Sequence, residues 1–259
     1  MEFLKIVRRR SFLSEVVYIA LNIALAISVV VVILITSSPA PAFALILLSK
    51  WRILAVRPRY WFVNLQANTV DMIVGLSAVV LLNATNQANL DGTQRATFLV
   101  LLTLMYIGWL LFLKPRSKRS YVIAQADVAL FVGVIALYTV SYVWPVSLVV
   151  LAMWLIGYST SRHILSHYDE PHVFFLSLVW GLVLSEIGWV AYHWTIAYGF
   201  LPQIAIIALC VAFLIHKSYD SYFHHQRIRI NDIVLPLLLA ISIVLVLVLF
   251  FNRVNIGSV

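Results

Sequence analysis

Residues 14–36 read SEVVYIALNIALAISVVVVILIT and contain one charged side chain, Glu15. A helix needs about 20 mostly apolar residues to cross the hydrocarbon core of a bilayer, and this stretch meets that length. The sequence therefore predicts a transmembrane helix here. Because the apolar run is long and no small-residue cleavage site follows it, we do not expect a cleavable signal peptide.

Eight further apolar stretches of similar length follow along the chain. The sequence therefore predicts an all-α, polytopic integral membrane bundle of nine transmembrane helices that forms a single transmembrane domain over residues 1–259. The second span is the shortest in strictly apolar residues. The nine predicted spans are 14–36, 39–55, 67–84, 95–113, 121–142, 145–161, 173–195, 199–216 and 233–251.

The composition agrees with this class and excludes others. Hydrophobic residues make up 63% of the chain and charged residues 11%, against about 25% charged residues in a soluble domain. The mean hydropathy is +0.99. This excludes a soluble enzyme, a disordered tail and a secreted disulfide scaffold, and the single cysteine, Cys210, cannot form an intramolecular disulfide.

The basic residues predict the orientation. With nine spans and the N-terminus inside, 16 of the 18 Lys and Arg fall on the inner side, as the positive-inside rule requires. Only Arg95 and Arg253 fall outside. We therefore expect a multi-pass protein of the plasma (inner) membrane with its C-terminus outside. The inner residues are Lys5, Arg8, Arg9, Arg10, Lys50, Arg52, Arg57, Arg59, Lys114, Arg116, Lys118, Arg119, Arg162, Lys217, Arg227 and Arg229.

The net charge of +8 is explained by these loops. We expect contact with the lipid bilayer and with anionic lipid headgroups at the inner face, but no nucleic-acid partner, because no basic stripe with interleaved aromatics is present. The sequence contains no phosphate-binding loop, dinucleotide fingerprint or zinc-protease motif, so no cofactor is expected.

The third and fifth predicted spans begin alike and suggest repeated helical hairpins. Gln66-Ala-Asn68 and Gln125-Ala-Asp127 are each followed by Val-Gly and are each preceded by a basic Pro-Arg turn. Internal repeats are common in transporter folds. The alternative is that helices starting at the inner face share this composition by chance.

Ionisable side chains inside a span are costly and are therefore candidates for function. Asn64, Asn68 and Asp71 are spaced to share one helix face and predict a polar stripe that enters the bilayer from the inner side. This stripe is either a cation, proton or substrate-headgroup site or a set of interhelical hydrogen bonds. Asp127 either faces Asp71 or forms an internal ion pair with Lys50 or Arg52.

Glu186 is the deepest charge in the sequence. Trp189 and His193 follow it on the same face, and one interpretation is a proton relay through these three residues. Otherwise Glu186 is a neutral or paired carboxyl that bonds across helices, because an isolated buried charge is heavily penalised. The small residues Ser177, Gly181, Ser185 and Gly188 form an adjoining seam that predicts close helix packing.

Six of the seven histidines are predicted on the inner side. His163 and His167 form an HxxxH pair, with His172 nearby, and these three are the candidate metal ligands. The pattern resembles the histidine boxes of membrane fatty-acid desaturases and hydroxylases, which implies a di-iron centre at the cytoplasmic face. The HxxHH box of that family is absent.

The layout of the chain also resembles membrane prenyltransferases of the aromatic-prenylating superfamily. These enzymes have nine spans and bind magnesium diphosphate at inner loops after spans two and six. Here those places hold the Asn64–Asp71 stripe, then Asp169 and Glu170, without the family's aspartate-rich motifs. Such chemistry requires more carboxylates than these.

Three functional hypotheses follow. The leading one is a permease or channel-like transporter whose pathway uses Asp71, Asp127 and Glu186. The second is a non-catalytic membrane scaffold or assembly partner, in which these groups only join helices. The third is a membrane-embedded enzyme that acts on a lipid or prenyl substrate at the cytoplasmic face.

Overall fold

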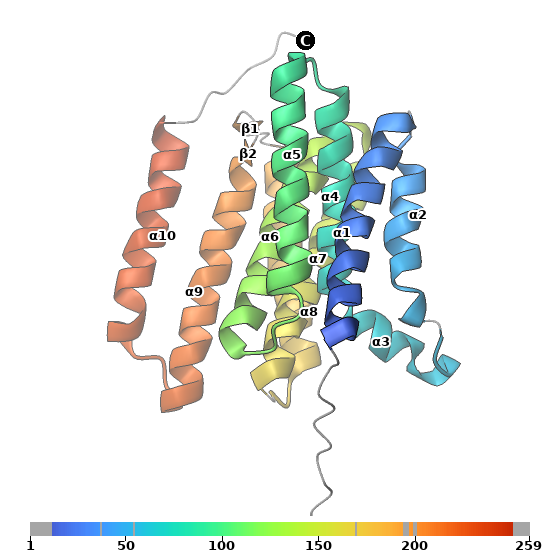
Figure 1. The fold of residues 1–259 in the computed structure, drawn as a ribbon. Coiled ribbons are helices and arrows are strands. Elements are labelled where there is room, and N and C mark those ends of the chain that lie inside the picture. Colours follow the sequence, from blue (N-terminus) through green and yellow to red (C-terminus); the bar gives the residue numbers. More distant parts are fainter. Residues whose placement is uncertain are drawn as a thin grey trace, which may run out of the picture.

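The computed structural model describes residues 12–36, 38–53, 55–168, 170–193, 197–198 and 201–250. Asp169, the basic residues of 1–11 and Arg253 lie outside these ranges, as does the side chain of Arg52. The described chain is a helical bundle with one antiparallel pair of two-residue strands, β1 and β2 (Figure 1). Its elements are α1 Phe12–Ile35, α2 Ala40–Ser49, α3 Trp61–Ala67, α4 Thr69–Gln87, α5 Gly92–Gly108, α6 Arg119–Val140, α7 Val146–Leu165, α8 Val173–His193, β1 Ala197–Tyr198, β2 Leu201–Pro202, α9 Gln203–His225 and α10 Ile230–Phe250.

Eight helices of the described chain are long and apolar enough to cross a membrane: α1 and α4 to α10. They coincide with eight of the predicted spans and indicate a multi-pass membrane protein. The remaining prediction, 39–55, contains α2 of only ten residues, followed by a 3-10 turn at Trp51–Ile53. Ten residues span about 15 Å, half of a hydrocarbon core of about 30 Å. The count of nine therefore stays a prediction.

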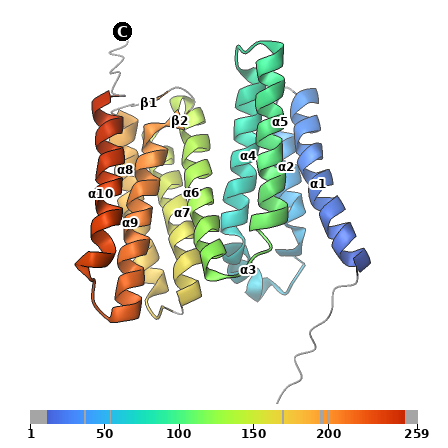
Figure 2. The ribbon, with the colours of Figure 1, turned by 60° about the vertical axis from the view of Figure 1, so that its left-hand side comes forward.

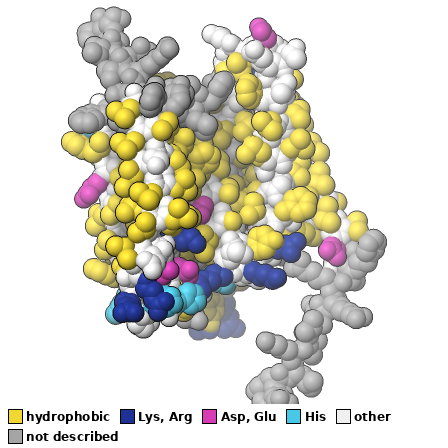
Figure 3. Space-filling model, turned by 90° about the vertical axis from the view of Figure 1, so that its left-hand side faces the viewer, with side chains coloured by type: hydrophobic (Ala, Val, Ile, Leu, Met, Phe, Trp, Pro, Cys, Tyr) yellow, Lys and Arg dark blue, Asp and Glu magenta, His cyan; other side chains and the backbone are white. Residues whose placement is uncertain are grey.

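The helices alternate in direction (Figure 1). α1 begins at the lower end in this view, α2 returns to it, α3 lies across it, and α10 ends at the upper end. Lys, Arg and His side chains gather at the lower end, and hydrophobic side chains cover the middle of the face drawn in Figure 3. We call the lower end the basic end; it contains Lys50, Arg57, Arg59, Lys114, Arg116, Lys118, Arg119, Arg162, Arg227 and Arg229.

The bundle has two halves, each with its own hydrophobic core (Figure 2). The N-terminal half, α1 to α5, packs around residues such as Ile46, Val74 and Leu110. The C-terminal half, α6 to α10, packs around residues such as Met153 and Leu184. The halves meet mainly along α4 and α6. Burial of apolar surface within each half therefore supplies most of the contacts that fix its helices.

The tightest contact in the bundle joins α7 and α8 and confirms the close packing predicted from the small-residue seam. A Cβ atom on Gly157 would lie 3.2 Å from the Cα of Gly181. A Cβ on Gly181 would lie 3.0 Å from the carbonyl oxygen of Trp154, and one on Gly188 would lie 2.6 Å from the Cγ of Met153. Only glycine lets the two backbones approach this closely.

Candidate functional site

Asp71 lies in the first turn of α4 and binds two lysines at the basic end. The Lys50 ammonium, just after α2, forms an ion pair with Oδ2. The Lys114 ammonium, just after the turn that follows α5, lies 2.9 Å from the same oxygen. The indole Nε1 of Trp109 donates a hydrogen bond of 3.0 Å to Oδ1. Only 12% of the Asp71 side chain is exposed, so this cluster joins three segments of the N-terminal half.

A π-helical turn, Trp109–Leu113, brings two of these partners to Asp71. It follows α5 directly, and its backbone closes by a bond of 2.9 Å from the Lys114 N–H to the Trp109 carbonyl, five residues back. The wider turn lets Trp109 and Lys114 both reach one carboxylate. Burial tends to lower the pKa of Lys114, but the Asp71 carboxylate outweighs burial and raises it. The Asp71 carboxylate therefore favours the charged form of Lys114.

The polar stripe predicted at this end is interrupted. Asn64 lies in α3, and Asn68 separates α3 from α4, so Asn64 and Asp71 are on different helices. Asn68 donates from Nδ2 to the Asn64 carbonyl over 2.8 Å, which satisfies the end of α3 locally. The similar stretch around Gln125 is inside a continuous helix, α6. The two stretches thus share sequence but differ in local structure.

The sequence predicted that Asp127 would face Asp71 or pair with a basic residue such as Lys50. In the structure Lys50 pairs with Asp71, and Asp127 has a different neighbour. It projects from α6 toward α9, where its Oδ1 lies 3.4 Å from Nδ1 of His216. Both atoms are fully buried, and neither makes a hydrogen bond of good geometry with a described residue. The exposed fractions of the two side chains are 26% and 16%. An acid and an imidazole therefore meet inside the C-terminal half.

The predicted metal ligands do not converge. The Nε2 atom of His163 lies 2.8 Å from Oε1 of Gln125. The amide of Gln125 in turn donates to the carbonyls of Leu113 and Arg116, so this contact ties α7 to the turn before α6. His167 and His172 are exposed. No group of three or more His, Cys, Asp or Glu side chains suited to a metal occurs within the described part of the chain.

Glu186 points away from the bundle. Its side chain is exposed on α8, as are those of Trp189 and His193. The ring of His193 contacts the Trp189 carbonyl, with Nδ1 at 2.9 Å from the oxygen. Within the described residues, no ion pair or hydrogen bond joins Glu186 to another helix, so the predicted bond across helices is not seen there. The physical reason is the seam, which occupies the opposite face of α8 and turns Glu186 outward.

Sequence reasoning missed an ionic and aromatic cluster at the basic end. Arg119, at the start of α6, pairs with Asp220 of α9 at 2.5 Å, and its guanidinium lies 3.9 Å from the ring centroid of Tyr168. Tyr219 donates a hydrogen bond to Glu170. Glu170, a candidate for metal–diphosphate chemistry above, thus has a hydroxyl partner. The cluster joins the basic ends of α6, α7 and α9.

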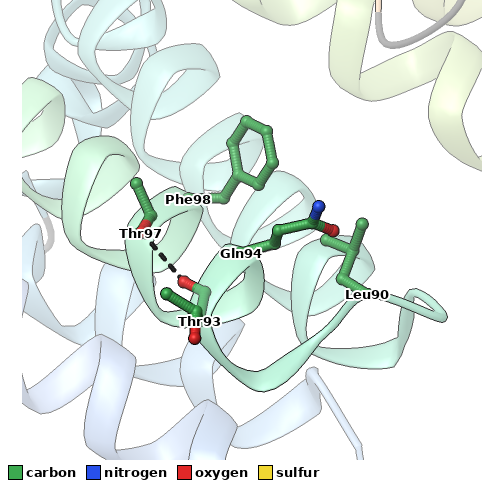
Figure 4. A pocket seen from close by; sticks show the side chains of 5 residues that line it. All are labelled: Leu90, Thr93, Gln94, Thr97 and Phe98. Carbon is green, nitrogen blue, oxygen red and sulfur yellow. Dashed lines mark hydrogen bonds between the residues drawn. The ribbon is translucent and has the colours of Figure 1, made fainter.

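A pocket of about 390 Å³ lies at the other end of the bundle, where α4 connects to α5. Figure 4 shows its lining side chains, among them Gln94, Thr97 and Phe98, on one side of α5. The hydroxyl of Thr97 donates a hydrogen bond of 2.8 Å to the Thr93 carbonyl. The pocket contains none of the predicted site residues.

Comparison with known proteins supplies no relative. No protein-family model, curated protein or solved structure matches the chain. The functional argument therefore depends on the geometry described above.

Proposed function

We propose that the protein is a small permease or channel-like transporter, and that the Asp127–His216 pair is the protonation site of its pathway. The observation that supports this most directly is the meeting of a partly buried carboxylate and a partly buried imidazole on two helices, α6 and α9, through two atoms that are themselves fully buried. These two groups can exchange a proton near neutral pH when they share a site. Gain or loss of that proton changes the attraction between the two helices.

The polar interior of the molecule supports this choice. Of the ten buried polar side chains in the described chain, eight lie in α6 to α9 and two, Asn22 and Ser77, in the N-terminal half. Along α9 they begin with Gln203 at the end opposite the basic end. Polar groups that line an interior reduce the free-energy cost of moving an ion or a polar solute through it.

Asp71 is a weaker candidate for the pathway than Asp127. The sequence predicted Asp71 as part of a polar stripe with Asn64 and Asn68. Two lysines neutralise its carboxylate, and Trp109 donates to the second oxygen. A carboxylate held by three donors does not readily accept a proton. We assign Asp71 a structural role at the basic end, where Lys114 remains partly exposed to meet anionic headgroups.

The first test uses purified protein in sealed vesicles that contain a pH-sensitive dye. A potassium gradient with valinomycin sets the membrane potential, and proton entry is recorded with and without a panel of amino acids, sugars and monovalent cations. We expect proton entry in the wild type, and entry at the level of protein-free vesicles for Asp127→Asn. The amide keeps the shape of the side chain but cannot exchange a proton.

Asp232→Asn is the matched control, because Asp232 lies at the basic end of α10, partly exposed. It should leave proton entry unchanged. His216→Gln should reduce entry as Asp127→Asn does. Equal proton entry in the wild type and in a well-folded Asp127→Asn variant would contradict the proposal.

We also propose that α2 with its flanking turns completes a ninth crossing in the plasma membrane, with the N-terminus inside. The alternation of helix direction and the basic end support this topology. In a Cys210→Ala background, single cysteines in 86–92 should react with an impermeant maleimide on intact cells. Cysteines in 115–119 should react only after the cells are opened. Labelling of 115–119 on intact cells would exclude this orientation.

A further inference from the structure

The outward face of α8 carries an ionisable group in the middle of an apolar surface. At about 1.5 Å per residue, Glu186 lies about 20 Å along α8 from Val173 and about 10 Å from His193. The face around it is exposed and consists of Phe175, Val179, Leu182, Trp189 and Val190. At about 100° per residue, Glu186 lies roughly 140° around the helix from Gly181 of the seam. Neither α7 nor the seam can therefore provide a partner for it.

A carboxylate that faces lipid at this depth is costly, and intramembrane acids normally pair with a cation or a hydrogen-bond donor. An exposed apolar face with one unpaired charge at its centre is also the arrangement that a second transmembrane helix can cover. Because Glu186 is an acid, the side chain that complements it on the covering helix is a base at the same depth.

A second copy of this chain does not provide that base. Two copies in the same orientation place equal residues at equal depths, and the sequence has no Lys or Arg near the depth of Glu186. The most deeply placed one, Lys217, is eight residues before the end of α9, about 12 Å from the basic end. A twofold pairing of this face would bring the two Glu186 side chains together, which like charges disfavour.

We propose that this face of α8 binds a transmembrane helix of a different protein that carries a lysine or arginine at the depth of Glu186. A charge-assisted hydrogen bond between the two side chains, formed away from water, fixes the partner and its register. The apolar residues around Glu186 supply the packing surface. This inference does not depend on the Asp127–His216 site.

The test measures energy transfer between the labelled protein and two synthetic probe helices in phosphatidylcholine vesicles. Both probes are Leu-Ala transmembrane peptides; one has a central lysine and the other a central leucine. The donor dye is on a single cysteine at Gly92 in a Cys210→Ala background. We expect the lysine probe to associate about tenfold more tightly than the leucine probe.

Glu186→Gln should reduce association of the lysine probe to the level of the leucine probe, and Glu186→Leu should do the same. Both variants change an outward side chain, so the bundle remains folded. Glu15→Gln is the matched control, since Glu15 is an exposed glutamate in the first turn of α1. It should keep the tenfold preference.

Two results would overturn the proposal. One is a wild type that binds both probes equally, or a Glu186→Gln variant that still prefers the lysine probe. The other comes from mixing donor- and acceptor-labelled copies of the protein without a probe. Self-association that Glu186→Gln abolishes would show that the face pairs with itself.

Discussion

Replacement of Asp71 by asparagine should lower the free energy of unfolding by about 3–5 kcal/mol, the usual cost of removing one partner from a buried ion pair. The substitution leaves the ammonium of Lys50, whose side chain is 11% exposed, without a counter-charge. It also removes the link between α2, α4 and the end of α5. Unfolding in mixed micelles of increasing denaturing-detergent fraction, followed by Trp fluorescence, measures the change.

The double variant Asp71→Asn/Lys50→Met should recover at least half of this loss, because the uncompensated buried charge is then gone. Asp220→Asn is the control for an exposed pair: Asp220 is 40% exposed, and its loss should cost about 1 kcal/mol or less. An Asp71→Asn variant as stable as the wild type would mean that the cluster does not hold the N-terminal half together.

Gly181→Ile should separate α7 from α8 and lower the free energy of unfolding by about 3 kcal/mol. Its first added atom would lie 3.0 Å from both the Trp154 ring and the Trp154 carbonyl oxygen, and a backbone oxygen cannot move aside as a flexible side chain can. The same unfolding assay applies, and cross-linking of cysteines placed on α7 and α8 reports the separation directly.

Gly108→Ile is the matched control for this substitution. A Cβ on Gly108 meets no atom within 4 Å, so the same side chain finds open space at the end of α5. It should change stability by about 1 kcal/mol or less. If both variants lowered the free energy of unfolding equally, the cause would be isoleucine in a membrane helix and not the α7–α8 contact.

The sequence predicted the long helices because a bilayer imposes a length and a composition on every segment that crosses it. It did not predict the local structure at 39–55, where apolar residues continue but the helix ends at Ser49 and a 3-10 turn follows. Hydropathy averages over a window and does not register where backbone hydrogen bonding stops. Trp51 and the basic side chains near it were the available signal of an earlier end.

Which way a side chain faces was harder to predict than where its helix lies. Glu186 was expected inside the bundle, either in a proton relay or as a neutral or paired carboxyl bonded across helices, but it is exposed on the face of α8 that lies away from Gly181. Position on a helix fixes the angle between two side chains but does not decide which of them meets a neighbour. A seam of small residues is the better guide, because it identifies the buried face and so the exposed one.

Partners distant in sequence could not be assigned. Lys114 reaches Asp71 through a π-helical turn that no local pattern marks, and His216 meets Asp127 across helices separated by α7 and α8 in the chain. His216 is one of the six histidines predicted on the inner side, and that prediction rests on its depth alone. Pairing depends on which helices are neighbours, and spans of similar composition leave that order open.

The separate cores of the two halves bear on how the chain is made. The residues of the first core precede α6, apart from Val128 and Ala129, and so do all members of the Asp71 cluster. Chains emerge from the ribosome N-terminus first, and regions with their own core fold as units during synthesis. The N-terminal half can therefore assemble in the membrane before α7 to α10 exist, and its exposed α4 surface then serves as the template on which α6 docks.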